Sequence, residues 1–147
     1  MSEAADVSPR GLAERVASVL RARGSECRGT VETTQQVAVG EILGTLAAEI
    51  PGSLVQREKT IEIEEPTDST GRRYDRPDFL FVAGGVTVAV ECKIKGGRDA
   101  VAKQVIAYAS SPQVDAVVLV TSRSQHRLGR SELLGKPFAT VWTSCEF

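Results

Sequence analysis

The chain has 147 residues, of which 41% are hydrophobic and 25% are charged, and its formal net charge is −1. This length and composition are those of one compact domain with a buried core. The charge excludes a protein that is basic overall, so any surface that binds nucleic acid must be a local cluster of basic residues.

Two helices are predicted in the first third of the chain. Ser8 can cap a helix that has Pro9 at its first position. The apolar residues that follow at helical spacing are Leu12, Val16, Val19 and Leu20. Gly24 ends this helix, and a longer helix is expected from about Thr30 to Ile50.

From residue 54 onward the patterns predict strands and helices in alternation. Strands are expected over residues 54–64, 79–82, 86–90, 114–121 and 138–143, and helices over residues 99–110 and 124–134. The continuous apolar run at 116–120 is typical of a central strand that is covered on both faces. Turn residues over 65–71 predict a mobile loop. This order implies a mixed β-sheet flanked by helices, which is an α/β fold.

The most informative segment is a predicted hairpin that is flanked by charged residues. Its two strands are joined by Gly84-Gly85, which is typical of a tight turn. Hairpin pairing can bring Asp78, before the first strand, close to Glu91, after the second, and two such carboxylates favour a divalent cation between them. Lys93 lies two residues after Glu91 and points to the same face. These residues suit metal-assisted phosphodiester hydrolysis; the alternative is a charged hairpin end in solvent.

Pro77-Asp78 and Glu91-Cys92-Lys93 resemble the signature of the PD-(D/E)xK nuclease superfamily. The resemblance implies a restriction-endonuclease-like fold, a mixed β-sheet flanked by helices with the core order α-β-β-β-α-β and, here, an extra N-terminal helix. Residues 1–29 would be a helical extension and residues 30–147 the nuclease-like domain. The resemblance also implies that Asp78, Glu91 and the carbonyl of Cys92 bind Mg²⁺, with Mn²⁺ as a substitute, and that Lys93 positions the attacking water.

Members of the superfamily often add an acid from the helix before the sheet. Glu41 lies thirteen residues before Leu54, a distance that resembles small Holliday-junction resolvases. We therefore prefer Glu41 to Glu32 and Glu49, and the alternative is an ordinary surface glutamate.

Gln104 and Tyr108 are four residues apart on the helix predicted after the Glu-x-Lys strand, so they share a face. Their spacing resembles the Gln-x-x-x-Tyr motif of exonuclease-like members, in which the pair supports the active site and contacts nucleic acid. The alternative is an amphipathic helix surface.

The remaining signals favour structure over chemistry. Cys27, Cys92 and Cys145 are an odd number without metal-ligand spacing, which favours a reducing, cytoplasmic compartment. His126 is expected at the surface and Trp142 in a packing role. No apolar run approaches the roughly 18 residues of a membrane span, so no membrane contact is expected.

These residues together predict a magnesium-dependent DNA phosphodiesterase that acts in DNA processing, recombination, repair or defence against phages and mobile elements. The basic residues expected to surround its site are Arg72, Arg73, Arg76, Lys95, Arg98 and Lys103. A chain of this size has little spare surface for a long duplex, so we expect a homodimer or a partner protein. The alternatives are a catalytically idle copy of the fold that binds DNA or protein, and an effector subunit that requires a partner.

Overall fold

The computed structural model describes residues 7–27, 32–64, 71 and 73–143, and the structural statements below concern this part of the chain. Six of its strands form one mixed sheet in the order β1-β4-β5-β6-β8-β7, while β2 and β3 form a separate pair. The elements are α1 (Pro9–Ala22), η2 (Gly24–Cys27), α2 (Glu32–Glu49), β1 (Leu54–Arg57), β2 (Ile61–Glu62), β3 (Tyr74–Asp75), β4 (Phe79–Ala83), β5 (Val86–Lys93), α3 (Arg98–Ala109), β6 (Ala116–Thr121), η3 (Ser124–His126), β7 (Glu132–Leu133) and β8 (Lys136–Trp142).

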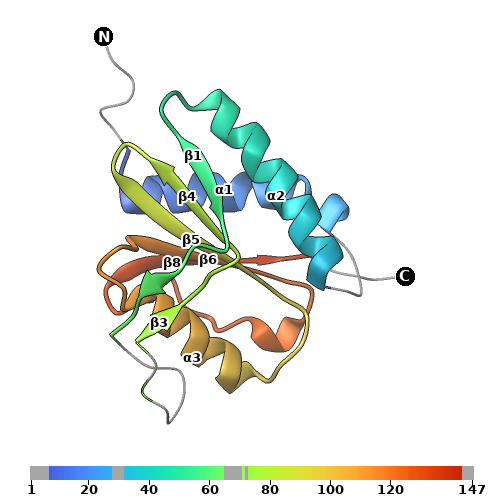
Figure 1. Cartoon of the computed structure of the whole chain (residues 1–147). Helices are drawn as coiled ribbons and strands as arrows, with labels where there is room; N and C mark the ends of the chain where they lie inside the picture. Colours follow the sequence, from blue (N-terminus) through green and yellow to red (C-terminus); the bar gives the residue numbers. More distant parts are fainter. Residues whose placement is uncertain (1–6, 28–31, 65–70, 72, 144–147) are drawn as a thin grey trace.

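The molecule has three layers, with α1 and α2 on one face of the sheet and α3 on the other (Figure 1). Because strand side chains alternate between the two faces, neighbouring residues of β4 and β5 enter different cores. Phe81 and Val90 pack with α1 and α2, whereas Leu80 and Ala89 pack on the side of α3. The predicted α/β class is therefore confirmed.

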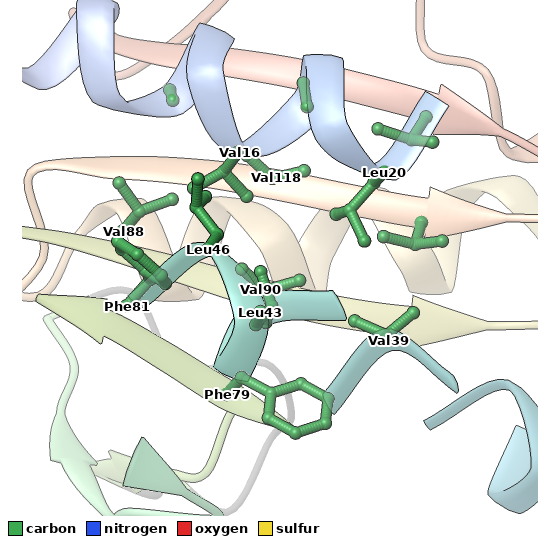
Figure 2. Close-up of a cluster of buried hydrophobic side chains, with 14 of the residues drawn as sticks. Val16, Leu20, Val39, Leu43, Leu46, Phe79, Phe81, Val88, Val90 and Val118 are labelled. Atoms are coloured by element: carbon green, nitrogen blue, oxygen red, sulfur yellow. The ribbon is translucent and has the colours of Figure 1, made fainter. Parts of the chain in front are cut away.

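The core beneath α1 and α2 is shown in Figure 2, and Val16 and Leu20 of α1 belong to the same cluster as Leu43 of α2 and the side chains of the sheet. All three side chains have no exposed surface. Full burial of such a side chain stabilises a fold by about 1.5–3 kcal/mol. Since α1 contributes to this core, the helix assigned to the N-terminal extension packs against the main sheet together with α2.

Helix α1 begins where the sequence predicts. The hydroxyl of Ser8 accepts a hydrogen bond from the N–H of Gly11 at 3.0 Å, and Pro9 occupies the first turn. Across the described residues, none of the helices combines the length and apolar character that crossing a membrane requires.

The sheet joins an antiparallel half to a parallel half at β5. Strands β1, β4 and β5 are antiparallel neighbours, whereas β5, β6 and β8 run parallel. In the β4–β5 turn, Gly84 and Gly85 have φ of 57° and 78°, the left-handed values that a two-residue hairpin turn requires. A Cβ at Gly84 would lie 2.9 Å from the side chain of Val7, so this turn position also needs glycine for space.

The prediction of one strand over residues 54–64 is wrong. Strand β1 ends at Arg57 because Glu58 adopts a φ of 49°, which interrupts an extended chain. The N–H of Glu58 donates instead to the carbonyl of Asp78 at 3.0 Å. The chain then resumes as β2, which pairs with β3 outside the main sheet. Of the predicted mobile loop, residues 65–70 lie outside the described part of the chain.

The predicted helix over residues 124–134 is also wrong. Only η3 is helical there, and the chain then turns at Gly129, with a φ of 67°, toward β7. Leu134 and Gly135 have φ of 52° and 77°, which form the tight turn into β8. The order of α2, β1, β4, β5, α3 and β6 nevertheless follows the predicted α-β-β-β-α-β order, with the β2–β3 pair inserted.

Candidate active site at the end of the β4–β5 hairpin

The hairpin brings Asp78 and Glu91 together, as predicted. Phe79 pairs with Val90, so the next position in the register sets Asp78 opposite Glu91. The N–H of Asp78 donates to Oε1 of Glu91 at 3.1 Å, and the N–H of Cys92 donates to Oδ2 of Asp78 at 2.8 Å. Each carboxylate is therefore held by the backbone of the opposite strand.

The two carboxyl groups lie in a poorly hydrated place. Glu91 is only 4% exposed. Burial and, after it, the negative charge of Asp78 raise the pKa of Glu91 to about 8, although the ammonium of Lys93 opposes both effects. Burial also raises the pKa of Asp78, against the hydrogen bond from the N–H of Cys92. Without a cation the site disfavours two negative charges, which is the electrostatic condition that favours binding of a cation.

Lys93 completes the predicted motif. Its Nζ lies 3.5 Å from Oε2 of Glu91, and its side chain is 23% exposed, so the ammonium reaches both the acid and solvent. The two oxygens of Glu91 have different surroundings: Oε1 accepts from the N–H of Asp78 and the hydroxyl of Tyr108, whereas Oε2 faces Lys93.

Helix α3 supports Glu91 through Tyr108. The hydroxyl of Tyr108 donates to Oε1 of Glu91 at 3.0 Å, and Nε2 of Gln104 donates to the same hydroxyl oxygen at 2.9 Å. Tyr108 has no exposed surface, and its burial raises the pKa of the phenol. The shared face predicted for Gln104 and Tyr108 is confirmed, and the buried hydroxyl contacts a carboxylate rather than the exterior.

Helix α2 supports the other side of the site with Glu32 and Gln36. Nε2 of Gln36 donates to Oδ1 of Asp78 at 3.0 Å. Oε1 of Glu32 accepts from the N–H of Ile94 at 2.8 Å, just beyond the motif. Glu32 and Gln36 are four residues apart and thus share a helix face. Sequence reasoning missed Gln36, although this spacing from Glu32 was the signal that could have identified it.

The preferred helix acid, Glu41, lies away from the acid pair. Nine residues separate it from Glu32, which is about 13 Å along an α-helix. Glu41 is exposed and lines a different hollow, of about 360 Å³, together with Val55 and Arg57. Glu49 is also exposed and lies farther along the helix. Of the three acids considered on α2, Glu32 is the one whose carboxylate contacts the backbone directly after β5.

The donors at the hairpin end suit a hard divalent cation. Mg²⁺ is usually held in proteins by one or two carboxylates together with water and substrate oxygens. The carboxylates of Asp78 and Glu91 and the carbonyl of Cys92 are such oxygen donors. A larger acidic cage is not present: in the described segments, no group of three or more His, Cys, Asp and Glu side chains could hold a metal ion.

His126 organises the loops beside Lys93, and its predicted surface position is wrong. The imidazole is fully buried, with Nε2 2.7 Å from the carbonyl of Gly96 and Nδ1 2.8 Å from the hydroxyl of Thr121. A carbonyl only accepts, so Nε2 carries a proton and donates to it. Nε of Arg123 adds a second link, to the carbonyl of Ile94 at 3.0 Å. The loops after β5 and β6 are therefore fastened together at this edge of the sheet.

The basic residues expected around the site are exposed where the structure describes them. These residues are Arg73, Arg76, Lys95, Arg98 and Lys103, and Arg72 lies outside the described part. One of them is tied to the protein, because a guanidinium nitrogen of Arg98 donates to the carbonyl of Leu128 at 3.4 Å.

No protein-family model matches this sequence, and no curated protein matches it. The geometry of the hairpin end therefore carries the functional assignment.

Proposed function

We propose that the chain is a magnesium-dependent DNA phosphodiesterase with a restriction-endonuclease-like fold. The observation that supports this most strongly is the reciprocal backbone hold on Asp78 and Glu91 with the Lys93 ammonium 3.5 Å from Glu91. A cluster of charges in solvent would leave its carboxylates exposed and free to move. Charges that are buried and held in place act more strongly on a reacting group, which is what a catalytic site requires.

The side chains have distinct tasks in this proposal. Asp78 and Glu91, with the carbonyl of Cys92, would hold Mg²⁺, which in such sites supplies Lewis-acid stabilisation of phosphate charge and makes water more acidic. Lys93 orients the attacking water through its N–H donors and offsets the negative charge that develops on the phosphate. Gln36 and Tyr108 hold the carboxylates in one geometry before the substrate arrives, which lowers the cost of organising the site.

The decisive experiment is a cleavage assay with purified protein on linear, circular, branched and single-stranded DNA, with Mg²⁺, Mn²⁺ or a chelator. We expect cleavage with either metal and none with the chelator. Lys93→Ala should abolish cleavage, whereas Lys59→Ala, at an exposed lysine that is not among the basic residues expected around the site, is the matched control that should retain it. Undiminished cleavage by folded Lys93→Ala would contradict the proposed mechanism.

One observation favours an alternative, in which the fold binds DNA or protein without cleaving it. Only two of the acids around the hairpin end, Asp78 and Glu91, face each other, and the raised pKa of Glu91 leaves it largely protonated near neutral pH in the absence of a cation. DNA binding without cleavage under every metal condition would support this alternative. Cleavage that begins only when a second protein is added would instead identify a partner-dependent effector.

We also propose a homodimer or a complex with a partner protein, because one 15.7 kDa chain offers few contacts to a duplex. Light scattering should therefore give about twice the monomer mass, or a monomer that gains DNA affinity when a partner is added. A monomer that binds duplex DNA tightly on its own would contradict this expectation.

A further inference from the structure

The carboxyl edge of the parallel strands carries an exposed tryptophan near the candidate active site. Lys93 pairs with Thr121, and Thr121 pairs with Trp142. Trp142 therefore lies two strands from Lys93, about 10 Å at the usual strand spacing. The predicted packing role of Trp142 does not fit its exposure of 42%.

An arginine lies over this tryptophan. The guanidinium carbon of Arg127 is 4.8 Å from the centroid of the Trp142 ring. Arg127 follows η3, in the loop that His126 fastens to Gly96, so this stacked pair rests on a fixed part of the site edge. A guanidinium on an aromatic ring keeps its charge available to a phosphate while the remaining ring surface can stack on a base.

Arg127 also lines an open groove of about 1000 Å³ that the described residues form between α1 and β8. Its lining contains Arg10, Arg15, Arg21, Arg127 and Arg130 but only one acidic residue, Glu14. Two of the arginines are engaged, since Arg10 pairs with Glu132 at 3.2 Å and Arg21 donates to the carbonyl of Thr140 at 3.0 Å.

The other three arginines of the groove, Arg15, Arg127 and Arg130, are exposed. The groove is thus a track of positive charge within a chain whose net charge is −1. Such a local concentration of arginine is the expected footprint of a phosphate backbone.

We propose that the groove between α1 and β8 binds an unpaired DNA strand, with its phosphates on Arg15, Arg127 and Arg130. A base of the same strand would stack on Trp142, which does not line the groove but lies against Arg127 at its side. A duplex keeps its bases stacked inside, so an exposed ring beside an arginine track fits a single strand better. The inference deepens the proposed function, on which it rests for the choice of DNA as ligand: the substrate would carry a single-stranded segment next to the scissile phosphate.

Trp142 is the only tryptophan of the chain and lies against Arg127 of the groove lining, so its fluorescence reports on binding at this side of the groove. Oligothymidylate is titrated into the wild-type protein at low salt with a chelator, which separates binding from cleavage. We expect saturable quenching, and an affinity at least about tenfold higher than for a duplex of equal length. Equal quenching by the duplex or by inorganic polyphosphate would overturn the proposal, because either would indicate a surface for any polyanion.

Variants identify the residues that bind. With fluorophore-labelled oligothymidylate, Trp142→Ala and Arg127→Ala should each weaken binding about tenfold, which is the scale of one base stack. Arg130→Ala gives a third readout at another arginine of the groove, should Trp142→Ala fail to fold. Arg23→Ala is the matched control, because Arg23 pairs with Glu26 at 2.6 Å and does not line the groove. Unchanged affinity in folded Arg127→Ala and Arg130→Ala would overturn the proposal.

The two proposals fail in different ways. A protein that cleaves DNA with Mg²⁺ but shows no quenching by oligothymidylate would retain the proposed function and lose the groove. Quenching that responds to Arg127→Ala in a protein without any cleavage would retain the groove and lose the catalytic assignment.

Discussion

The hydroxyl of Tyr108 joins α3 to the acid pair through a 3.0 Å hydrogen bond to Glu91. Tyr108→Phe removes this donor and keeps the buried ring. A hydrogen bond to a charged group contributes about 1.5–3 kcal/mol, so cleavage should fall at least about tenfold. The melting temperature should fall only by the amount that the loss of this one hydrogen bond explains, because the packing of the ring is retained. A large loss of stability with a proportionate loss of activity would make Tyr108 a structural residue instead.

The same contact provides a test of Gln104, which reaches Glu91 only by way of Tyr108. Gln104→Ala alone should lower cleavage by about tenfold, or roughly 1.4 kcal/mol of barrier. In the Tyr108→Phe background the same change should have almost no effect, because the path to Glu91 has already been removed. Additive losses in this double-mutant cycle would show that Gln104 acts on the substrate by itself.

The raised pKa of Glu91 predicts how stability depends on pH in the presence of a chelator. Burial and the charge of Asp78 move this pKa from 4.5 to about 8 in the folded state. Between these values the folded protein holds a proton that the unfolded chain has lost, so the free energy of unfolding should fall as pH rises from 4.5 to about 8. The raised pKa of Asp78 acts in the same direction. Urea unfolding across this range measures the slope, and Glu91→Gln should flatten it; an equal slope in Glu91→Gln would assign the effect to other groups.

At the scale of elements, α2 carries two neighbouring glutamines with opposite surroundings. Gln36 holds Asp78, whereas Gln35 is fully buried, and neither its amide nitrogen nor its oxygen has a hydrogen-bond partner among the described residues. An unsatisfied buried polar group costs about 1–3 kcal/mol. Gln35→Met should therefore raise the free energy of unfolding by about that amount, measured with urea. Gln36→Met is the matched control and should lower cleavage without this gain; a loss of stability in Gln35→Met would show that the amide has a role in folding.

The elements that the sequence predicted are those whose signals are local. The Ser8 cap, the Gly84-Gly85 turn and the apolar run of β6 each depend on residues close in the chain. The wrong predictions, a strand over residues 54–64 and a helix over residues 124–134, concern segments whose conformation depends on contacts with distant parts of the chain. The segment beyond η3 extends because it meets β8, with the N–H of Phe138 on the carbonyl of Ser131 at 2.9 Å, and no local pattern encodes that contact.

The site divides in the same way. Asp78 and Glu91 were predictable because the register of a hairpin places residues at a known spacing in the sequence opposite each other. Tyr108 was predictable because its helix directly follows the strand that carries Glu91. Gln36 and His126 were missed because their partners, Asp78 and Gly96, lie 42 and 30 residues away in the chain. Contacts of this kind depend on how α2 and the loop after β6 pack, which a single sequence does not specify.

At the scale of the whole molecule, two sets of basic side chains bear on DNA binding: those expected around the acid pair, and those that line the groove between α1 and β8. If one DNA strand spans both, each phosphate contact should contribute about −0.7 to the slope of log affinity against log salt for single strands. Lys103→Ala, from the first region, and Arg130→Ala, from the second, should each make the slope shallower by about that amount. Anisotropy of labelled oligothymidylate over a series of salt concentrations, with chelator present, measures these slopes, and Arg23→Ala provides the reference. A slope that responds to Lys103→Ala but not to Arg130→Ala would confine the strand to the acid pair, and the reverse would place bound DNA away from Lys93.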